Sequence, residues 1–167
     1  MDEPQELVSA AEARKAVQDM CRRIGLLHMC YARAIVDALG EEEGKDLIRQ
    51  AIWDYGTRIG EKTRQQVIAQ GLEPTVENMG AASDLSPIGW DMSSAVIDGE
   101  PRHRVFDCAI AQPWLEYGEE DLGDLYCLVD PAKMQAYDPE WTMVHVRKIT
   151  RGDSCCELAR RRRKGGA

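Results

Sequence analysis

The feature that most constrains the fold is a change of hydrophobic period near residue 93. Before this point, apolar residues recur at helical spacing, first from Ile24 to Leu39 and then from Ile48 to Ile59. From Ser94 onward, short segments read as strands bounded by turn residues. Helices followed by strands in one chain indicate an α+β fold, in which the helices pack on an antiparallel sheet.

Turn and capping residues set the limits of the first two helices. Ser9-Ala-Ala-Glu12 has the spacing of a capping box, so a helix is expected to begin there. Gly40 is suited to end that helix, and Glu41-Glu42-Glu43 then places negative charge in the first turn of the next one. The second helix is expected to continue to Gly71.

Gly56 and Gly60 lie one turn apart on the second helix and predict the close approach of another backbone. That backbone could belong to the same chain or to a second copy of it. A homodimer is therefore compatible with the sequence.

Residues 72–92 contain Gly, Pro, Asn and Asp without clear periodicity and predict a long ordered loop. A loop of this length inside a compact domain is often functional. Asn78 and Asp84 are its polar candidates, and ordinary turn chemistry is the interpretation we prefer for both.

Two hairpins are expected in the second half of the chain, over 94–111 and 141–161. A turn centred on Arg151-Gly152 would pair His145 with Leu158 and Arg147 with Cys156. Directly opposed residues share a face, so His145, Arg147 and Cys156 are expected on one side of the sheet. A slip of one residue would reverse this assignment for one strand.

Length and composition suit one domain over residues 1–167, with a helical part at about 9–71, an α+β part at about 93–161 and a basic tail at 160–167. The formal net charge is −8, although Arg160 to Lys164 are all positive. An acidic body argues against nucleic acid and against an anionic membrane surface as the main partner. The basic run is interpreted as a solvated strand end and tail.

The segment Met1–Glu6 is acidic and polar, and no apolar run is long enough to cross a bilayer. We therefore expect a cytoplasmic protein with reduced thiols. The six cysteines include no C-x-x-C pair, which argues against a zinc ribbon or a thioredoxin-type motif; they are Cys21, Cys30, Cys108, Cys127, Cys155 and Cys156.

The stretch Gly118–Asp130 concentrates acids, two glycines and a cysteine in about one helix length. At helical spacing, an apolar stripe expected to face a core is formed by Leu122, Leu125, Tyr126 and Val129. Beside this stripe, Gly123, Cys127 and Asp130 lie on one face. This face could form the edge of a small-molecule pocket. The residue pattern alone favours the alternative, a buried structural cysteine and a capping aspartate before Pro131.

Three kinds of site are compatible with these residues. In a thiol site, Cys127 would be the nucleophile and His145 the base, with Asp130 or Asp153 orienting the imidazole. A zinc site could use Cys108, Cys127, His145 and Cys156, but these ligands come from separate elements, so no cofactor is expected. A site for a small zwitterion would hold its carboxylate by arginine and its amine by acid, although a solvated surface explains most such residues equally well.

Several segments together resemble the L-2-amino-thiazoline-4-carboxylic acid hydrolase family. The resemblance extends from about Ile24 to Leu158, and Leu-Tyr-Cys-x-x-Asp and Gly-Asp-x-x-Cys are its most specific parts. The segments that carry it are His28-Met-Cys-Tyr-Ala-Arg33, Leu39-Gly-Glu-Glu-Glu-Gly44, Tyr55-Gly-Thr-Arg-Ile-Gly-Glu61, Gly118–Asp130 and Gly152-Asp-Ser-Cys-Cys-Glu157. The last hairpin is also distantly similar to small-molecule-binding domains of the 4-vinyl-reductase type, which share a TRAPP-like α+β fold, although Leu158 stands where an aromatic is more usual.

The family resemblance implies hydrolysis of a cyclic isothiourea, or of a related C–N or C–S bond, to an N-carbamoyl cysteine. A thiol or an activated water, a histidine and a carboxylate would carry that reaction. The candidate residues fit this chemistry, as they would fit other reactions. The catalytic candidates are Cys127, His145, Asp130 and Cys156, and the substrate-binding candidates are Arg147, Arg104, Glu120, Asp153 and Cys108. The alternative is a non-catalytic module that binds a small molecule or metal, or a partner subunit of another enzyme.

Overall fold

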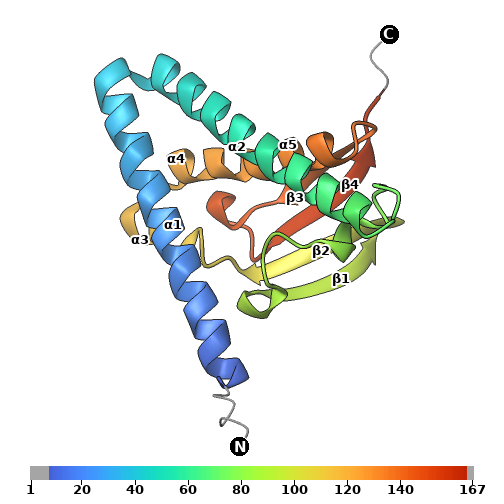
Figure 1. Cartoon of the computed structure of the whole chain (residues 1–167). Coiled ribbons are helices and arrows are strands. Elements are labelled where there is room, and N and C mark those ends of the chain that lie inside the picture. The colour runs from blue at the N-terminus through green and yellow to red at the C-terminus, as the bar shows by residue number, and fades with distance from the viewer. Residues whose placement is uncertain (1–7, 165–167) are drawn as a thin grey trace, which may run out of the picture.

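Two long helices, joined at a glycine, form the first half of the chain. In this computed structural model, which describes residues 8–164, α1 spans Ala10–Leu39 and α2 spans Glu41–Ala69. The predicted capping box is present, because the Ser9 side chain accepts from the Glu12 amide while Glu12 accepts from the Ser9 amide at 3.0 Å. Gly40 lies between the helices with φ of +85°, so the chain reverses direction there and the helices diverge as a V (Figure 1).

The second half builds one antiparallel sheet with the order β1-β2-β4-β3. Both predicted hairpins are present, and β4 inserts between β2 and β3. The first hairpin turns at Asp98 and Gly99, both with positive φ, as a two-residue turn of type I′ requires. The four strands are β1 (Asp91–Ile97), β2 (Glu100–Asp107), β3 (Trp141–Arg147) and β4 (Cys156–Arg162).

The chain between the hairpins is helical almost throughout. Leu122 is buried as predicted, and the absence of a side chain at Gly123 lets the Trp114 ring pack directly against the backbone. Trp114 in turn donates a hydrogen bond of 2.9 Å to the Gly25 carbonyl of α1. The elements are α3 (Gln112–Tyr117), α4 (Glu120–Asp124), the 3-10 turn η3 (Leu125–Leu128) and α5 (Val129–Tyr137).

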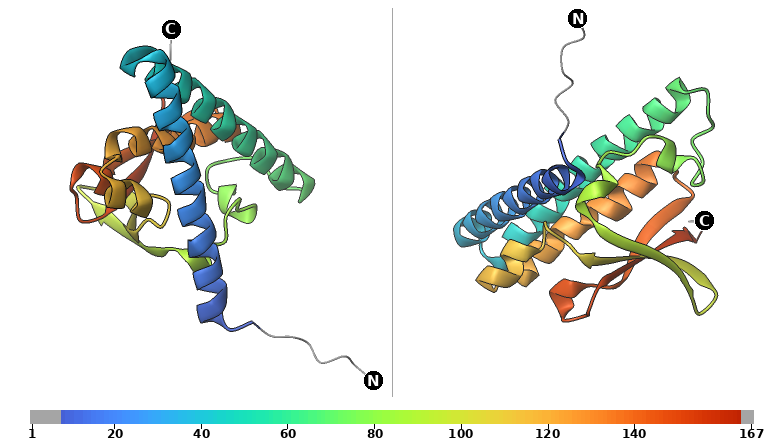
Figure 2. Two further views of the ribbon diagram at one scale, coloured as in Figure 1. Left: turned by 90° about the vertical axis from the view of Figure 1, so that its left-hand side faces the viewer. Right: turned by 90° about the horizontal axis from the view of Figure 1, so that it is seen from below.

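Helix α5 lies between α2 and the sheet, so the molecule has three layers in this region (Figure 2). A Cβ at Gly56 would lie 2.7 Å from the Val129 carbonyl oxygen, and one at Gly60 would lie 2.2 Å from that of Lys133. The predicted close approach is therefore confirmed, and the approaching backbone is α5 of the same chain. This pair of glycines is not available to a second copy.

The connection from α2 to β1 is the predicted long loop, and it contains two 3-10 turns, η1 (Met79–Ala81) and η2 (Pro87–Gly89). Its first part is anchored by hydrogen bonds that Thr75 accepts from the Tyr137 hydroxyl and that Val76 accepts from Arg160. Its last part packs on α1. The loop is thus held at both ends while its middle crosses towards α5.

No helix within residues 8–164 combines the length and the apolar character needed to cross a bilayer. The acidic segment Met1–Glu6, on which the cytoplasmic expectation partly rests, lies outside the described range, as do the last three residues of the basic tail. Arg160 to Arg162 belong to β4.

Candidate functional site

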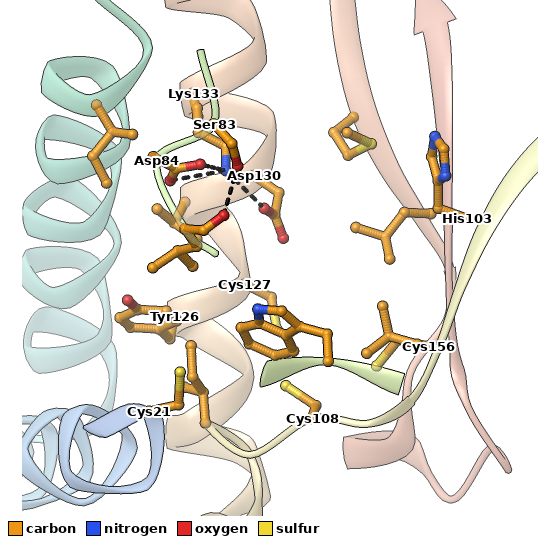
Figure 3. Close-up of a pocket in the computed structure, with 18 of the residues that line it drawn as sticks. Cys21, Ser83, Asp84, His103, Cys108, Tyr126, Cys127, Asp130, Lys133 and Cys156 are labelled. Carbon is orange, nitrogen blue, oxygen red and sulfur yellow. Dashed lines mark hydrogen bonds and ion pairs between the residues drawn. The ribbon is translucent and has the colours of Figure 1, made fainter. Parts of the chain in front are cut away.

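A cavity of about 590 Å³ lies between α2, α5, the long loop and one face of the sheet. We call this face the inner face; it carries His103, His145, Cys156 and Leu158. In Figure 3, Tyr126 and Cys127 approach the cavity from the helical side, whereas His103 and Cys156 approach it from the sheet. Five of the predicted site residues line this one cavity: Cys108, Cys127, Asp130, His145 and Cys156.

The shortest polar contact between two predicted catalytic residues joins α5 to β3. Asp130 lies in the first turn of α5, and its Oδ2 is 3.1 Å from Nε2 of His145 in the middle of β3. Only 9% of the His145 side chain is exposed, so this pair is largely withdrawn from water. Burial favours the neutral form of Asp130, but the hydrogen bond from His145 and the charge of Lys133 outweigh it and lower the pKa of the carboxyl. Asp130 is therefore an ionised partner that fixes the imidazole.

Lys133 connects this pair to the long loop. Its Nζ lies 3.9 Å from Oδ1 of Asp130 and 3.3 Å from each carboxylate oxygen of Asp84 (Figure 3). Only 16% of the lysine side chain is exposed. One ammonium group is thus shared by a carboxylate of the site and a carboxylate of the loop.

The thiols of the cavity are held in the neutral form. Burial raises the pKa of Cys127 well above its usual range, and the nearby Asp130 carboxylate adds to the increase although Lys148 opposes it. Burial likewise raises the pKa of Cys108 to about 12 and that of Cys156 in the same direction. The thiolate is the nucleophilic form of cysteine, so at neutral pH these side chains present protonated, weakly reactive sulfur.

The expectation that Arg147 lies beside Cys156 is wrong. His145 pairs with Leu158 as predicted, but a bulge follows and Arg147 pairs with Glu157. The extra residue shifts the alternation of side chains, so Arg147 projects to the opposite, outer face of the sheet. Arg104 also lies on the outer face, where its Nε is 3.4 Å from Glu157. Neither arginine lines the cavity.

The two remaining predicted substrate-binding residues also lie away from the cavity. Asp153 closes the last turn by accepting a hydrogen bond of 2.9 Å from the Lys148 amide. Glu120 borders a smaller surface hollow of about 260 Å³ beside the ion pair of Arg33 and Glu119. Their proposed contacts with a substrate have no support from this placement.

The predicted site left out other polar residues of the cavity, among them Lys133, His103 and Tyr126. Lys133 follows Asp130 by three residues, a spacing that would have revealed it if the helix had been continued past Pro131. His103 shares its strand face with Val105, but strand alternation alone does not distinguish a cavity wall from packed core. Tyr126 was assigned to the apolar stripe; its ring packs edge-on against His28, and burial raises the pKa of its hydroxyl.

The zinc alternative is not supported by the geometry. Across residues 8–164, no three His, Cys, Asp or Glu side chains converge in a way that could hold a metal ion. All six cysteines lie in this part of the chain, and each is a free thiol.

Comparison with known proteins gives one match. The search of curated proteins and the search of solved structures each find nothing similar to the chain, so the likeness to 4-vinyl-reductase-type domains remains a prediction. The sequence model described as L-2-amino-thiazoline-4-carboxylic acid hydrolase matches residues 12–159, which run from the first turn of α1 to Ala159 in β4. The chain therefore belongs to the L-2-amino-thiazoline-4-carboxylic acid hydrolase family.

Proposed function

We propose that the protein is a hydrolase that opens a small cyclic isothiourea or a related heterocycle at a C–S or C–N bond. The observation that supports this most directly is the contact of 3.1 Å between Asp130 and His145 in the wall of a cavity of ligand size. The family name supplies the reaction type. We also propose that the protein works in a reducing, cytoplasmic compartment and that its reaction uses no metal.

The proposed general base is His145. Asp130 accepts the proton of Nε2 in a hydrogen bond, which leaves Nδ1 as the ring nitrogen able to accept a proton from water. Water oxygen then bonds to the amidine-like carbon while His145 takes one proton. As the carbon–sulfur bond breaks, the sulfur receives that proton and becomes a thiol, and the second water proton goes to the ring nitrogen. The oxygen remains as the carbonyl of an N-carbamoyl product.

The alternative mechanism uses Cys127 as the nucleophile. It requires a thiolate, and burial next to Asp130 disfavours that form. We therefore assign the thiols of Cys108, Cys127 and Cys156 to the wall of the site and the attack to water.

Turnover of aminothiazoline carboxylate by purified protein is the direct test, with the N-carbamoyl cysteine product measured by mass spectrometry so that the six protein thiols do not interfere. We expect His145→Gln to lower kcat by about 100-fold or more, as loss of a general base does. The matched control is the double variant Cys127→Ser, Cys156→Ser, which is expected to keep its turnover within a few-fold. An inactive, folded double variant would refute attack by water and restore the thiol mechanism.

A second candidate is a non-catalytic binding module, favoured by the largely apolar wall that Trp90, Ile110 and Met143 give the cavity. It predicts a small molecule that copurifies with the protein and no turnover of any heterocycle. Native mass spectrometry of freshly purified protein separates the two functions, because a hydrolase releases its product.

A further inference from the structure

The cavity contains a position suited to bind an anion, and the predicted site did not include it. Among the lysines and arginines of residues 8–164, only Lys62 and Lys133 line the cavity. Lys62 is exposed, whereas the Lys133 side chain is 16% exposed and points between α5 and the loop. The arginines expected to hold a substrate carboxylate, Arg104 and Arg147, lie on the outer face of the sheet. Lys133 is therefore the one largely buried cation of this cavity.

The position beside Lys133 is held by a residue of the loop. Asp84 places both carboxylate oxygens 3.3 Å from Nζ, which is longer than the usual separation in a charge-assisted hydrogen bond, about 2.7–2.9 Å. Asp130, the other neighbouring carboxylate, is 3.9 Å away and is bonded to His145 instead. A carboxylate from a ligand can therefore replace Asp84 on Lys133 without disturbing the contact between Asp130 and His145.

The size and character of the remaining space describe the rest of the ligand. A volume of about 590 Å³ lies within the range of sites that hold drug-sized ligands. A single five-membered ring with one amino group and one carboxylate is much smaller than such ligands. The walls away from Lys133 are mostly apolar, and they include Ile59, Trp90, Val105, Ile110, Met143 and Leu158.

We propose that the heterocycle opened by this protein carries both a carboxylate and an apolar or aromatic body, so that the whole substrate is larger than one five-membered ring. Its carboxylate binds Lys133 in place of Asp84, and its body lies between Trp90 and the inner face of the sheet. The word substrate rests on the proposed hydrolase function, but the binding claim does not.

Binding of three probes tests the proposal without any turnover. The probes are 2-naphthoate, its neutral counterpart 2-naphthamide, and aminothiazoline carboxylate, each titrated into the full chain by calorimetry with tryptophan fluorescence as a second signal. We expect naphthoate to bind about tenfold more tightly than naphthamide, and also more tightly than aminothiazoline carboxylate. Two tryptophans line the cavity, so the naphthyl probes should also change the emission.

Four variants assign the anion position. Lys133→Gln should remove the preference for naphthoate while leaving naphthamide affinity unchanged, and Lys133→Arg should retain the preference. Asp84→Asn should strengthen naphthoate binding, because it removes the competing carboxylate. Arg147→Gln, on the outer face, is the matched control and should leave the affinities for both naphthyl probes unchanged. Thermal unfolding of each variant checks that it is folded.

Several outcomes would overturn the proposal. Equal affinity of the wild type for the two naphthyl probes, binding of neither, or loss of the preference in Arg147→Gln instead of Lys133→Gln would remove Lys133 as the anion position. If aminothiazoline carboxylate binds as tightly as naphthoate, the proposal that the substrate has a larger body is refuted. If the binding pattern holds and no heterocycle is turned over, the hydrolase function fails while this site stands.

Discussion

The two faces of the sheet differ in what their side chains do, although they belong to the same strands. On the outer face, the Glu157 carboxylate is 2.9 Å from Arg102 and 3.4 Å from Arg104, and only 3% of its side chain is exposed. On the inner face, the neighbouring residues Cys156 and Leu158 border a cavity. On the outer side the strands carry paired charged groups, whereas on the inner side they carry side chains that border a space.

This difference shows how a small sheet can border a cavity and remain stable. An inner face that borders a space gives up contacts that a packed core would make. The outer face compensates, since the Glu157 network ties β2 to β4 where they pair. We therefore expect substitutions on the outer face to change stability and those on the inner face to change activity or binding.

The largest expected effect is on the cavity side, at the α5 residue that contacts His145 of the inner face. Asp130→Asn removes the ionised partner of His145 and should lower kcat by about 100-fold or more, because the imidazole loses its orientation and its charge partner. Steady-state turnover of aminothiazoline carboxylate measures it. Glu157→Gln is the control and should keep kcat within about threefold per folded molecule. A similar loss of kcat in both variants would contradict the separation of the two faces.

Glu157→Gln should instead be the most costly change for stability. It leaves Arg102 and Arg104 without their shared buried counter-ion, which typically costs about 3 kcal/mol of unfolding free energy. Urea unfolding followed by circular dichroism gives the value. A loss below about 1 kcal/mol would mean that the outer network behaves as exposed ion pairs do.

Leu158→Ala, at the adjacent position on the inner face, should show the reverse pattern. Its side chain borders a cavity and is partly buried, so we expect a stability loss of only about 1 kcal/mol. Naphthoate binding should weaken at the same time, because the apolar wall becomes smaller. Calorimetry and urea unfolding of the same sample test both parts, and an unchanged affinity would place the probe elsewhere.

The smallest expected effect is a difference between the two sides of the sheet in how stability depends on pH and salt. On the outer side, the hydrogen bond from Arg161 lowers the pKa of Glu100 from 4.5 to about 2, so this pair contributes stability above pH 4.5 that is lost as the pH falls through about 2. On the inner side, the pKa of Asp130 is lowered from 3.8, so its contribution is likewise present above pH 3.8 and lost below it.

Salt should distinguish these two contributions. Glu100 pairs chiefly with the exposed Arg161 and more weakly with the largely buried Arg102, so about 1 M salt should screen much of its contribution. The buried pair of Asp130 and His145 should retain most of its own. Urea midpoints at about pH 5 and about pH 3 measure this in Glu100→Gln and Asp130→Asn. If salt abolishes the acid sensitivity that remains in Glu100→Gln, the inner pair is more exposed to solvent than the structure indicates.

Local sequence patterns predicted much of the fold. The capping residues at Ser9 and Glu12, the alternation in both hairpins and the pairing of His145 with Leu158 were all readable, because each depends on residues close together in the chain. The spacing of Cys127 and Asp130 also placed both on one helical face, and both line the cavity.

Features set by distant contacts were not readable. The insertion of β4 between β2 and β3 is one, and the ion pair between Lys133 and Asp84 is another. Asp84 was assigned to turn chemistry because nothing near it in sequence identifies a cation partner. The raised pKa of Cys127 was equally hidden, since it depends on how much protein surrounds the thiol.

The bulge in β3 has a consequence for how this strand tolerates changes in length. Val146 has no partner in the register between His145 and Arg147. Deleting it would let Arg147 follow His145 directly and still pair with Glu157, so each side chain would keep its face. Deleting a residue earlier in β3 would exchange the faces of the residues on one side of the deletion. Val146 is thus the position at which the strand can be shortened while histidine and arginine remain on opposite sides.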